Sequence, residues 1–251
     1  MERLLTREKA AIVLAAGKGK RMKSDLPKVL HAINGRPMIT FLLDTLVKIG
    51  FERIVVVVGH KGELVREALA DYPVEFVWQR EQRGTGDAVK CAGEIMKDFD
   101  GITLVAAGDV PFLSATAIQA LLEKHETTGA SATCLSAVFD DPSEYGRIVR
   151  EDSSDRLREI VEHKDASGEV RALKEINTGT FCFDNRQLFE ALALVQDDNT
   201  QGEYYLTDVV KIMHSKSLTI SVMRTQWPDE VRGVNSADDL AYLAERFGRQ
   251  L

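Results

Sequence analysis

The first half of the chain alternates between short apolar runs and longer amphipathic stretches. Apolar runs at 11–16, 53–60, 74–79 and 102–109 are typical of strands that are buried on both faces of a sheet. Between them, apolar residues recur at helical spacing over 37–50, 63–70 and 87–99, and Ser114 is positioned to cap a further helix. Strands that alternate with helices predict a parallel sheet with helices on both faces.

The pattern changes after an apolar segment at 131–139. Residues 140–175 are polar, charged and rich in turns, and contain short strand candidates at 147–150 and 158–161. We expect an antiparallel lobe over the sheet. After it the pattern predicts a return strand at 177–184, helices at 186–194 and 206–213, and a strand at 218–223. A last helix is predicted at about 237–247, because Ser236 and Asp239 form a capping pair at its start.

Charge and cysteine usage narrow the classes of function. The chain has 251 residues and a net charge of −7, which argues against binding nucleic acid or an anionic membrane through bulk charge. Three cysteines without a C-x-x-C pair, and an N-terminus without the apolar core of a signal peptide, indicate a soluble protein of the reducing cytoplasm. An anionic ligand would therefore have to be met by a local basic cluster.

Such a cluster follows the first predicted strand, in the sequence LAAGKGKRMKSDLPKVL at 14–30. Doubly wound sheets bind ligands at the carboxyl end of their strands, and glycines let backbone N–H groups approach an anion closely. The spacing matches neither G-x-G-x-x-G nor G-x-x-x-x-G-K-[ST]. The loop is therefore either a phosphate site of another kind or a solvated surface loop. Its cations are Lys18, Lys20, Arg21, Lys23 and Lys28.

Two more segments carry candidate chemistry. Asp109 ends the fourth predicted strand in the sequence GDVP, where a carboxylate can hold a hard cation such as Mg²⁺ or simply form a turn. The segment WQREQRGTGDAV at 78–89 joins a strand to a helix. Its amides, Gln79 and Gln82, can read a base edge through hydrogen bonds, although a polar surface loop has the same composition.

Taken together, these segments resemble the sugar-nucleotide pyrophosphorylases and related nucleotidyltransferases. The shared motifs are G-x-G-x-R-M-x4-P-K, G-D-x-P and Q-x-x-x-x-G-T-x-x-A. In the second half, EYGRIVRE, IVEHKDA, EINTG and QGEYYLTD occur in one order. With them the chain is similar, over about 11–243, to the uridylyltransferase half of the bifunctional N-acetylglucosamine-1-phosphate uridylyltransferase/glucosamine-1-phosphate acetyltransferases.

The resemblance implies a fold and a reaction. The fold is α/β, with a Rossmann-like, mostly parallel sheet, helices on both faces and an inserted antiparallel sugar-binding lobe. One unit over 1–251 would contain a nucleotide-binding half at about 9–139, the lobe and return elements at about 140–235, and a C-terminal helix at about 236–251. The reaction would use UTP and N-acetylglucosamine-1-phosphate, with Mg²⁺ as cofactor, and would give UDP-N-acetylglucosamine, a cell wall precursor, and pyrophosphate.

The resemblance also assigns roles to individual positions. Catalytic roles fall to Arg21, Lys28 and Asp109, and the metal ligands would be Asp109 and Asn235. The nucleotide would contact Leu14, Ala15, Gly17, Gly19, Lys28, Gln79, Gly84 and Thr85. The sugar would contact Gly146, Glu162, Asn177, Tyr205 and Thr207.

Two departures leave substrate selectivity open. Ala107 stands where the family often has an aromatic residue, and Asp87 stands where it often has histidine. The alternatives are a pyrophosphorylase for another hexose-1-phosphate or NTP, and a non-catalytic nucleotide-sugar-binding protein. The hexapeptide repeats of an acetyltransferase β-helix do not occur in these 251 residues. We therefore expect no second enzyme and no trimer formed through such a domain, and the oligomeric state stays open.

Overall fold

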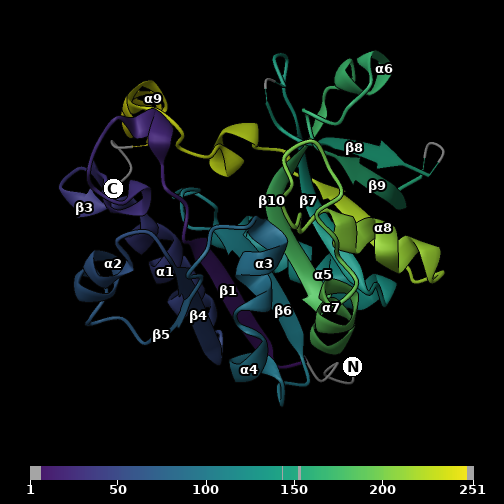
Figure 1. Cartoon of the computed structure of the whole chain (residues 1–251), viewed down its shortest axis with the longest axis horizontal. Coiled ribbons are helices and arrows are strands. Elements are labelled where there is room, and N and C mark those ends of the chain that lie inside the picture. Colours follow the sequence, from purple (N-terminus) through teal and green to yellow (C-terminus); the bar gives the residue numbers. More distant parts are fainter. Residues whose placement is uncertain (1–6, 143, 152–153, 248–251) are drawn as a thin grey trace.

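A mixed sheet forms the centre of the computed structural model, which describes residues 7–142, 144–151 and 154–247 (Figure 1). Within these residues the strand order is β11-β7-β10-β6-β1-β4-β5, and β8 and β9 join the sheet beside β10. The strands of the main path are β1 (Lys9–Ala15), β4 (Arg53–Val58), β5 (Glu75–Trp78), β6 (Ile102–Ala107), β7 (Ala132–Val138), β10 (Glu175–Asp184) and β11 (Ile220–Arg224). Each except β7 overlaps a strand predicted from the apolar pattern, and β7 lies within the apolar segment at 131–139.

Strand direction decides which residues share an edge of the sheet. Strands β5, β4, β1 and β6 run parallel to one another, and β11 runs parallel to β7. Strand β10 lies between β6 and β7 and is antiparallel to both. The start of β10 therefore lies at the same edge as the ends of β1, β5 and β6, which confirms the mostly parallel fold class.

Helices cover both faces of the sheet, as predicted. On one face pack α1 (Met38–Ile49), α2 (Gly62–Ala68) and α5 (Ala115–Thr128). On the other pack α3 (Thr85–Lys90), α4 (Gly93–Met96), α7 (Asn185–Leu192) and α8 (Asp208–Ser215), which Figure 1 shows in front of the strands. In β1, Ala11 and Val13 enter the first core, whereas Ala10 and Ile12 enter the second. Burial on both faces explains why this strand is apolar from Ala10 onward.

Capping residues mark the beginnings and ends of helices where the sequence predicts. Gly50 closes α1 in the left-handed conformation, with φ of +84°. The hydroxyl of Ser114 accepts a hydrogen bond from the N–H of Ala117 at 3.1 Å and begins α5. Before α9 (Ala237–Phe247), Ser236 and Asp239 bond each other reciprocally, at 2.8 Å and 3.1 Å from their backbone N–H groups.

Some predicted elements were wrong in extent. The single helix expected at 87–99 is broken into α3 and α4. The N–H of Ala92 donates to Val89 O at 3.0 Å, which makes a tight turn before Gly93. The helix expected at 206–213 begins two residues later, at Asp208. Helix α6 (Gly168–Arg171) and the small hairpin of β2 (Ala32–Ile33) and β3 (Arg36–Pro37) were not predicted.

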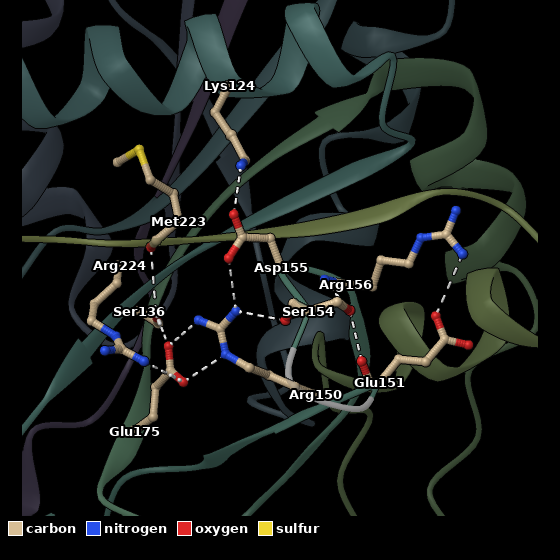
Figure 2. Close-up of polar contacts among 10 residues, drawn as sticks. All are labelled: Lys124, Ser136, Arg150, Glu151, Ser154, Asp155, Arg156, Glu175, Met223 and Arg224. Carbon is tan, nitrogen blue, oxygen red and sulfur yellow. Dashed lines mark hydrogen bonds and ion pairs between the residues drawn. The ribbon is translucent and has the colours of Figure 1, made fainter.

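The antiparallel lobe is confirmed and is anchored to the sheet by a polar cluster. Strands β8 (Arg147–Arg150) and β9 (Leu157–Val161) pair with each other, and β8 pairs with β10. Arg150 donates to both oxygens of the Glu175 carboxylate, at 2.8 Å and 2.6 Å (Figure 2). Ser136 and Arg224 add hydrogen bonds to the same carboxylate. The Arg150–Glu175 ion pair therefore joins the hairpin of β8 and β9 to the main sheet, and both of its side chains are mostly shielded from water.

Among the helices of the described residues, none is long and apolar enough to cross a bilayer. The N-terminal residues that lack a signal-peptide pattern, 1–6, and the last four residues of the predicted 1–251 unit lie outside the described residues.

Candidate active site

The loop after β1 folds back onto the carboxyl edge of the sheet. Gly19 has φ of +57°, and a Cβ atom there would lie 2.8 Å from the Cβ of Lys28. Glycine is the residue that tolerates both this conformation and this close approach. Lys28 consequently lines the same cavity as Leu14, at the end of β1, and Asp109, just after β6.

Lys28, Asp109 and Asn235 meet at this edge although they come from three distant segments. The Lys28 ammonium forms an ion pair with the Asp109 carboxylate and donates to Asn235 Oδ1 at 3.2 Å. The side chains of Lys28 and Asp109 are 18% and 15% exposed, so their charges are only partly hydrated. The N–H of Val234 donates to Asp109 O at 2.9 Å, which holds the Asn235 segment beside β6.

The geometry of this cluster suits a hard cation. A carboxylate oxygen and an amide oxygen face one ammonium group, so the two side chains already converge on a single positive charge. Carboxylate and amide oxygens are the ligands that Mg²⁺ accepts, usually together with waters and substrate phosphates. Among the described residues no group of three or more His, Cys, Asp or Glu side chains forms a complete protein site. Asp109 and Asn235 can therefore hold a metal only together with ligands from elsewhere.

Arg21 lies beside this cluster and reaches the inserted lobe. Its guanidinium donates to Asn235 Oδ1 at 3.1 Å and to the Glu144 carboxylate at 2.7 Å. The Arg21 and Glu144 side chains are largely exposed, so a ligand can exchange with this pair. Arg21 and Asn235 line a cavity of about 630 Å³ next to the cluster. Glu144, Tyr145 and Arg232 also line it; the first two begin the motif EYGRIVRE, but none of the three was assigned a site role from the sequence.

The predicted nucleotide-binding residues line one cavity. Its volume is about 490 Å³, and all eight of them contribute to its wall: Leu14, Ala15, Gly17, Gly19, Lys28, Gln79, Gly84 and Thr85. Asp109 lines the same cavity, as do Lys18 and Gln82 from the two loop motifs. The loops after β1, β5 and β6 thus form the wall together, because parallel strands end at a common edge.

Gln79 is held in one orientation within this wall. It is 3% exposed, and its Nε2 donates to Gly84 O at 2.9 Å and to Asp87 Oδ2 at 2.8 Å. Arg83 in turn contacts Asp87 Oδ1 at 3.3 Å. The pairing of Arg83 with Asp87 is visible in the sequence as opposite charges four residues apart, but its link to Gln79 is not. Ala107, the other departure from the family pattern, also lines the cavity.

The loop that follows Gln79 is tied to the second half of the chain. Gly84 has φ of +114°, and a Cβ atom there would lie 2.5 Å from Tyr204 O. The hydroxyl of Thr85 accepts a hydrogen bond from the N–H of Leu206 at 3.0 Å. Gly84 and Thr85 therefore join the cavity wall to the QGEYYLTD segment as well as facing the cavity.

The predicted sugar-binding residues form a second cluster. Thr207 donates to Glu162 Oε1 at 3.0 Å, and a Cβ atom at Gly146 would lie 3.3 Å from Glu162 Oε2. The N–H of Asn177 donates to Gly146 O at 2.8 Å, which joins β10 to the start of β8. Burial raises the pKa of Glu162 above its ordinary value of 4.5, although Thr207 opposes the shift.

Tyr205 lies at the side of this cluster. It is 6% exposed, its hydroxyl accepts a hydrogen bond from Gln201 Nε2 at 2.8 Å, and burial raises its pKa to about 12. The phenol is therefore neutral at physiological pH and can act as a hydrogen-bonding group but not as a base. None of the five sugar candidates lines the 490 Å³ cavity. Glu203, from the same segment as Tyr205, does.

Comparison with known proteins identifies the family. Residues 11–203 match the model described as the MobA-like NTP transferase domain. The protein named Bifunctional protein GlmU of Geobacillus sp. (strain WCH70) is 48% identical over 96% of this chain and 52% of its own length. The same-named protein of Shouchella clausii (strain KSM-K16) is 48% identical over 90% of this chain and 49% of its own. The chain thus spans about half the length of these curated relatives.

A solved structure supports the fold. A UDP-glucose pyrophosphorylase complexed with UDP-glucose superposes with a TM-score of 0.76, over 97% of this chain and 100% of the other, at 16% identity. At that identity the likeness shows the fold alone, and it confirms the nucleotide-diphospho-sugar transferase fold expected from the motifs. With the family model covering most of its length, the chain belongs to the MobA-like NTP transferase domain family and is a nucleotidyltransferase.

Proposed function

We propose that this chain transfers UMP from UTP to N-acetylglucosamine-1-phosphate, forming UDP-N-acetylglucosamine and pyrophosphate. Asp109 and Asn235 carry the proposal, because both contact Lys28 at the cavity that all eight nucleotide candidates line. The identity with the GlmU proteins, over nearly the whole chain, supports this choice of substrates.

The proposed reaction is an in-line displacement. An oxygen of the sugar phosphate attacks the α-phosphorus of UTP and forms the new P–O bond. The bond from that phosphorus to the bridging oxygen breaks, and pyrophosphate leaves with the electron pair. The attacking oxygen is already ionised, so no general base is needed. Catalysis then depends on positioning and on neutralisation of charge.

Lys28 and Arg21 would supply positive charge to the phosphates. Lys28 is mostly shielded from water, which strengthens its interaction with an anion in the cavity. The backbone at Gly17 and Gly19 lines the same cavity and lets N–H groups approach phosphate oxygens. Arg21 would exchange its exposed contact with Glu144 for the leaving pyrophosphate.

Asp109 and Asn235 would hold Mg²⁺ together with substrate phosphates and water. When bound, the ion supplies Lewis-acid stabilisation of the charge that develops on the phosphate oxygens. A cation at these two oxygens would compete with the Lys28 ammonium for them, which leaves Lys28 available for phosphate.

The sugar would contact Gly146, Glu162, Asn177, Tyr205 and Thr207. A half-buried carboxylate bonded to a buried hydroxyl discriminates between sugars, since an analogue that lacks a partner leaves these groups unpaired. We further propose that the halves at 9–139 and 140–235 act as one unit, because Glu203 from the second half lines the nucleotide cavity.

A substrate panel tests the proposal. UTP, dTTP, CTP and ATP are combined with N-acetylglucosamine-1-phosphate and other hexose-1-phosphates in the presence of Mg²⁺, and pyrophosphate release is measured. UTP with N-acetylglucosamine-1-phosphate should give the highest kcat/KM. Asp109→Asn should lower it by about 100-fold or more. Asp71→Asn, which makes the same change at an exposed position, is the matched control.

Other outcomes would contradict the proposal in distinct ways. A higher kcat/KM with another pair would assign a different pyrophosphorylase. Tight binding of UDP-sugars without any turnover would indicate a nucleotide-sugar-binding protein. Near-normal Mg²⁺-dependent turnover by Asp109→Ala, which has no side-chain oxygen, would remove Asp109 from the metal site.

A further inference from the structure

Asp87 lies behind the cavity wall and accepts a hydrogen bond from the side chain of Gln79. The side-chain nitrogen of Gln79 donates to Gly84 O and to Asp87 Oδ2. A backbone carbonyl only accepts hydrogen bonds, so the end of the amide that faces Gly84 is its nitrogen. At 3% exposure, Gln79 has almost no water with which to replace these partners if the amide turns.

Asp87 is itself held in place. Its side chain is 13% exposed, and its two oxygens have separate donors, Arg83 on Oδ1 and Gln79 on Oδ2. The Arg83 guanidinium lies over the ring of Tyr204, 5.6 Å from the ring centre. Arg83, Asp87 and Gln79 therefore form a connected series of contacts that ends at the cavity.

This orientation leaves one polar atom of Gln79 for a ligand. Both N–H groups of its amide are used, one by Gly84 O and one by Asp87. Its Oε1 accepts no hydrogen bond from the part of the chain that the structure describes, while the residue lines the 490 Å³ cavity. Within the described residues, the Gln79 side chain therefore offers the cavity a hydrogen-bond acceptor and no free N–H.

We propose that Asp87 is a positioning residue that locks the Gln79 amide and thereby selects a base with an imide N–H, uracil or thymine, over cytosine. The inference rests on the proposed function, in which Gln79 contacts the base. Uracil and thymine carry a donor at N3, which Oε1 can accept. Cytosine carries an acceptor at N3, which Oε1 repels. An amide released from Asp87 can turn and donate to N3 of cytosine.

The ratio of kcat/KM for different nucleotides tests this inference. UTP, dTTP and CTP are each supplied with the same sugar phosphate to the wild type and to Asp87→Ala. The UTP-to-CTP ratio of kcat/KM should fall at least about tenfold in the variant. In the wild type, cytosine places an acceptor against the Gln79 acceptor, and leaving a buried polar group without a partner costs enough free energy for at least about tenfold discrimination. The UTP-to-dTTP ratio should stay constant, because both bases present the same N3–H. Lys90→Ala, an exposed change on the same helix, should leave both ratios unchanged.

Asp87→Asn provides a second variant in case Asp87→Ala does not fold. It keeps the size of the side chain but offers one oxygen to two donors, Arg83 and Gln79, so the UTP-to-CTP ratio should fall in the same direction by a smaller factor. A purely structural role for Asp87 would lower turnover with every nucleotide alike, and an unchanged ratio overturns the inference. Wild type that releases pyrophosphate from no substrate pair overturns the proposed function instead.

Discussion

The hydroxyl of Thr85 accepts a hydrogen bond from the backbone N–H of Leu206, at 3.0 Å and across 121 positions of the sequence. Two backbone hydrogen bonds flank it, each 2.8 Å long, from Gly86 N–H to Tyr204 O and from Tyr204 N–H to Arg83 O. The loop that forms the nucleotide cavity is therefore fastened to the segment that carries Tyr205 and Thr207. We therefore expect a distortion on one side of this junction to affect the other side.

Gly84→Ala should disrupt this junction. The φ of +114° is strongly unfavourable for alanine, and its Cβ would meet Tyr204 O at 2.5 Å, within the backbone of the partner segment. We expect a loss of about 3 kcal/mol in the free energy of unfolding, together with a loss of turnover. Denaturation in urea measures the change. Gly129→Ala is the control. At that position φ is +56°, a conformation that costs alanine about 1 kcal/mol in stability, and the added Cβ would have no atom within 4 Å.

Glu175→Gln should weaken the attachment of the lobe. Burial alone would raise the pKa of Glu175, but hydrogen bonds from Arg150, Ser136 and Arg224 outweigh it and hold the pKa below 4.5. The carboxylate therefore stabilises the fold above pH 4.5, and this contribution disappears as the pH falls through the lowered folded-state pKa. At pH 7 we expect a loss of about 2 kcal/mol in unfolding free energy.

The difference between Glu175→Gln and wild type should shrink when urea denaturation is repeated below pH 4.5. Glu151→Gln is the matched control. That side chain is 43% exposed and lies 3.7 Å from Arg156 in the neighbouring turn (Figure 2), so its effect should stay within about 0.5 kcal/mol. Equal effects of the two variants would show that the Arg150 pair does not anchor the lobe.

His125 should make stability depend on pH between about 4 and 6.5. Its ring is 1% exposed and contacts Thr133 Oγ1 at 3.0 Å. Burial, aided by the charge of Arg7, lowers its pKa from 6.5 to about 4. In that range the unfolded chain takes up a proton that the folded chain does not, so the unfolding free energy falls as the pH falls, by about 3 kcal/mol in total.

His125→Asn should flatten this part of the pH profile, because the amide keeps a polar contact for Thr133 and does not titrate. Thermal or urea unfolding at several pH values measures the slope. His60→Asn removes an exposed imidazole and serves as the control. A slope that is the same in His125→Asn and wild type would assign the pH dependence to other groups.

Glu162→Gln should affect the sugar phosphate more than the nucleotide, if the proposed function holds. The carboxylate accepts from Thr207 and does not line the nucleotide cavity. We expect the KM for N-acetylglucosamine-1-phosphate to rise about tenfold, because the free energy of one hydrogen bond to a charged group corresponds to about a tenfold change in affinity. The KM for UTP should change less than about twofold. Steady-state kinetics with Glu169→Gln, an exposed glutamate of α6, as control separates the two. An equal rise of both KM values would place Glu162 outside a dedicated sugar site.

Most secondary structure was predictable because it depends on local pattern. Strand β1 is apolar on both faces and could not be mistaken for a surface strand, and Gly50, Ser114 and Ser236 mark helix ends through their own backbone chemistry. The break between α3 and α4 was missed. The apolar spacing continues through it, and only the folded backbone shows the tight turn at Ala92, just before Gly93.

The candidate site was partly predictable for a different reason. The loops that carry Gly19, Gln79 and Asp109 all follow parallel strands, and such strands end at one edge, so their convergence follows from the order of elements. The positions of Asn177 and Asn235 do not follow from that order. Asn177 reaches the edge because β10 runs antiparallel, and Asn235 because its segment bonds to Asp109.

Short stretches of residues were enough to predict the alternating strands and helices, the basic loop at one strand end and the family of the chain. The folded chain was needed to show that one ammonium, from Lys28, lies between the oxygens of Asp109 and Asn235, and that Asp87 accepts a hydrogen bond from the Gln79 amide. The reason is physical. Which strands pair, and which way a buried side chain turns, depends on the burial and hydrogen bonding of the whole sheet and its loops, and no single segment contains that information.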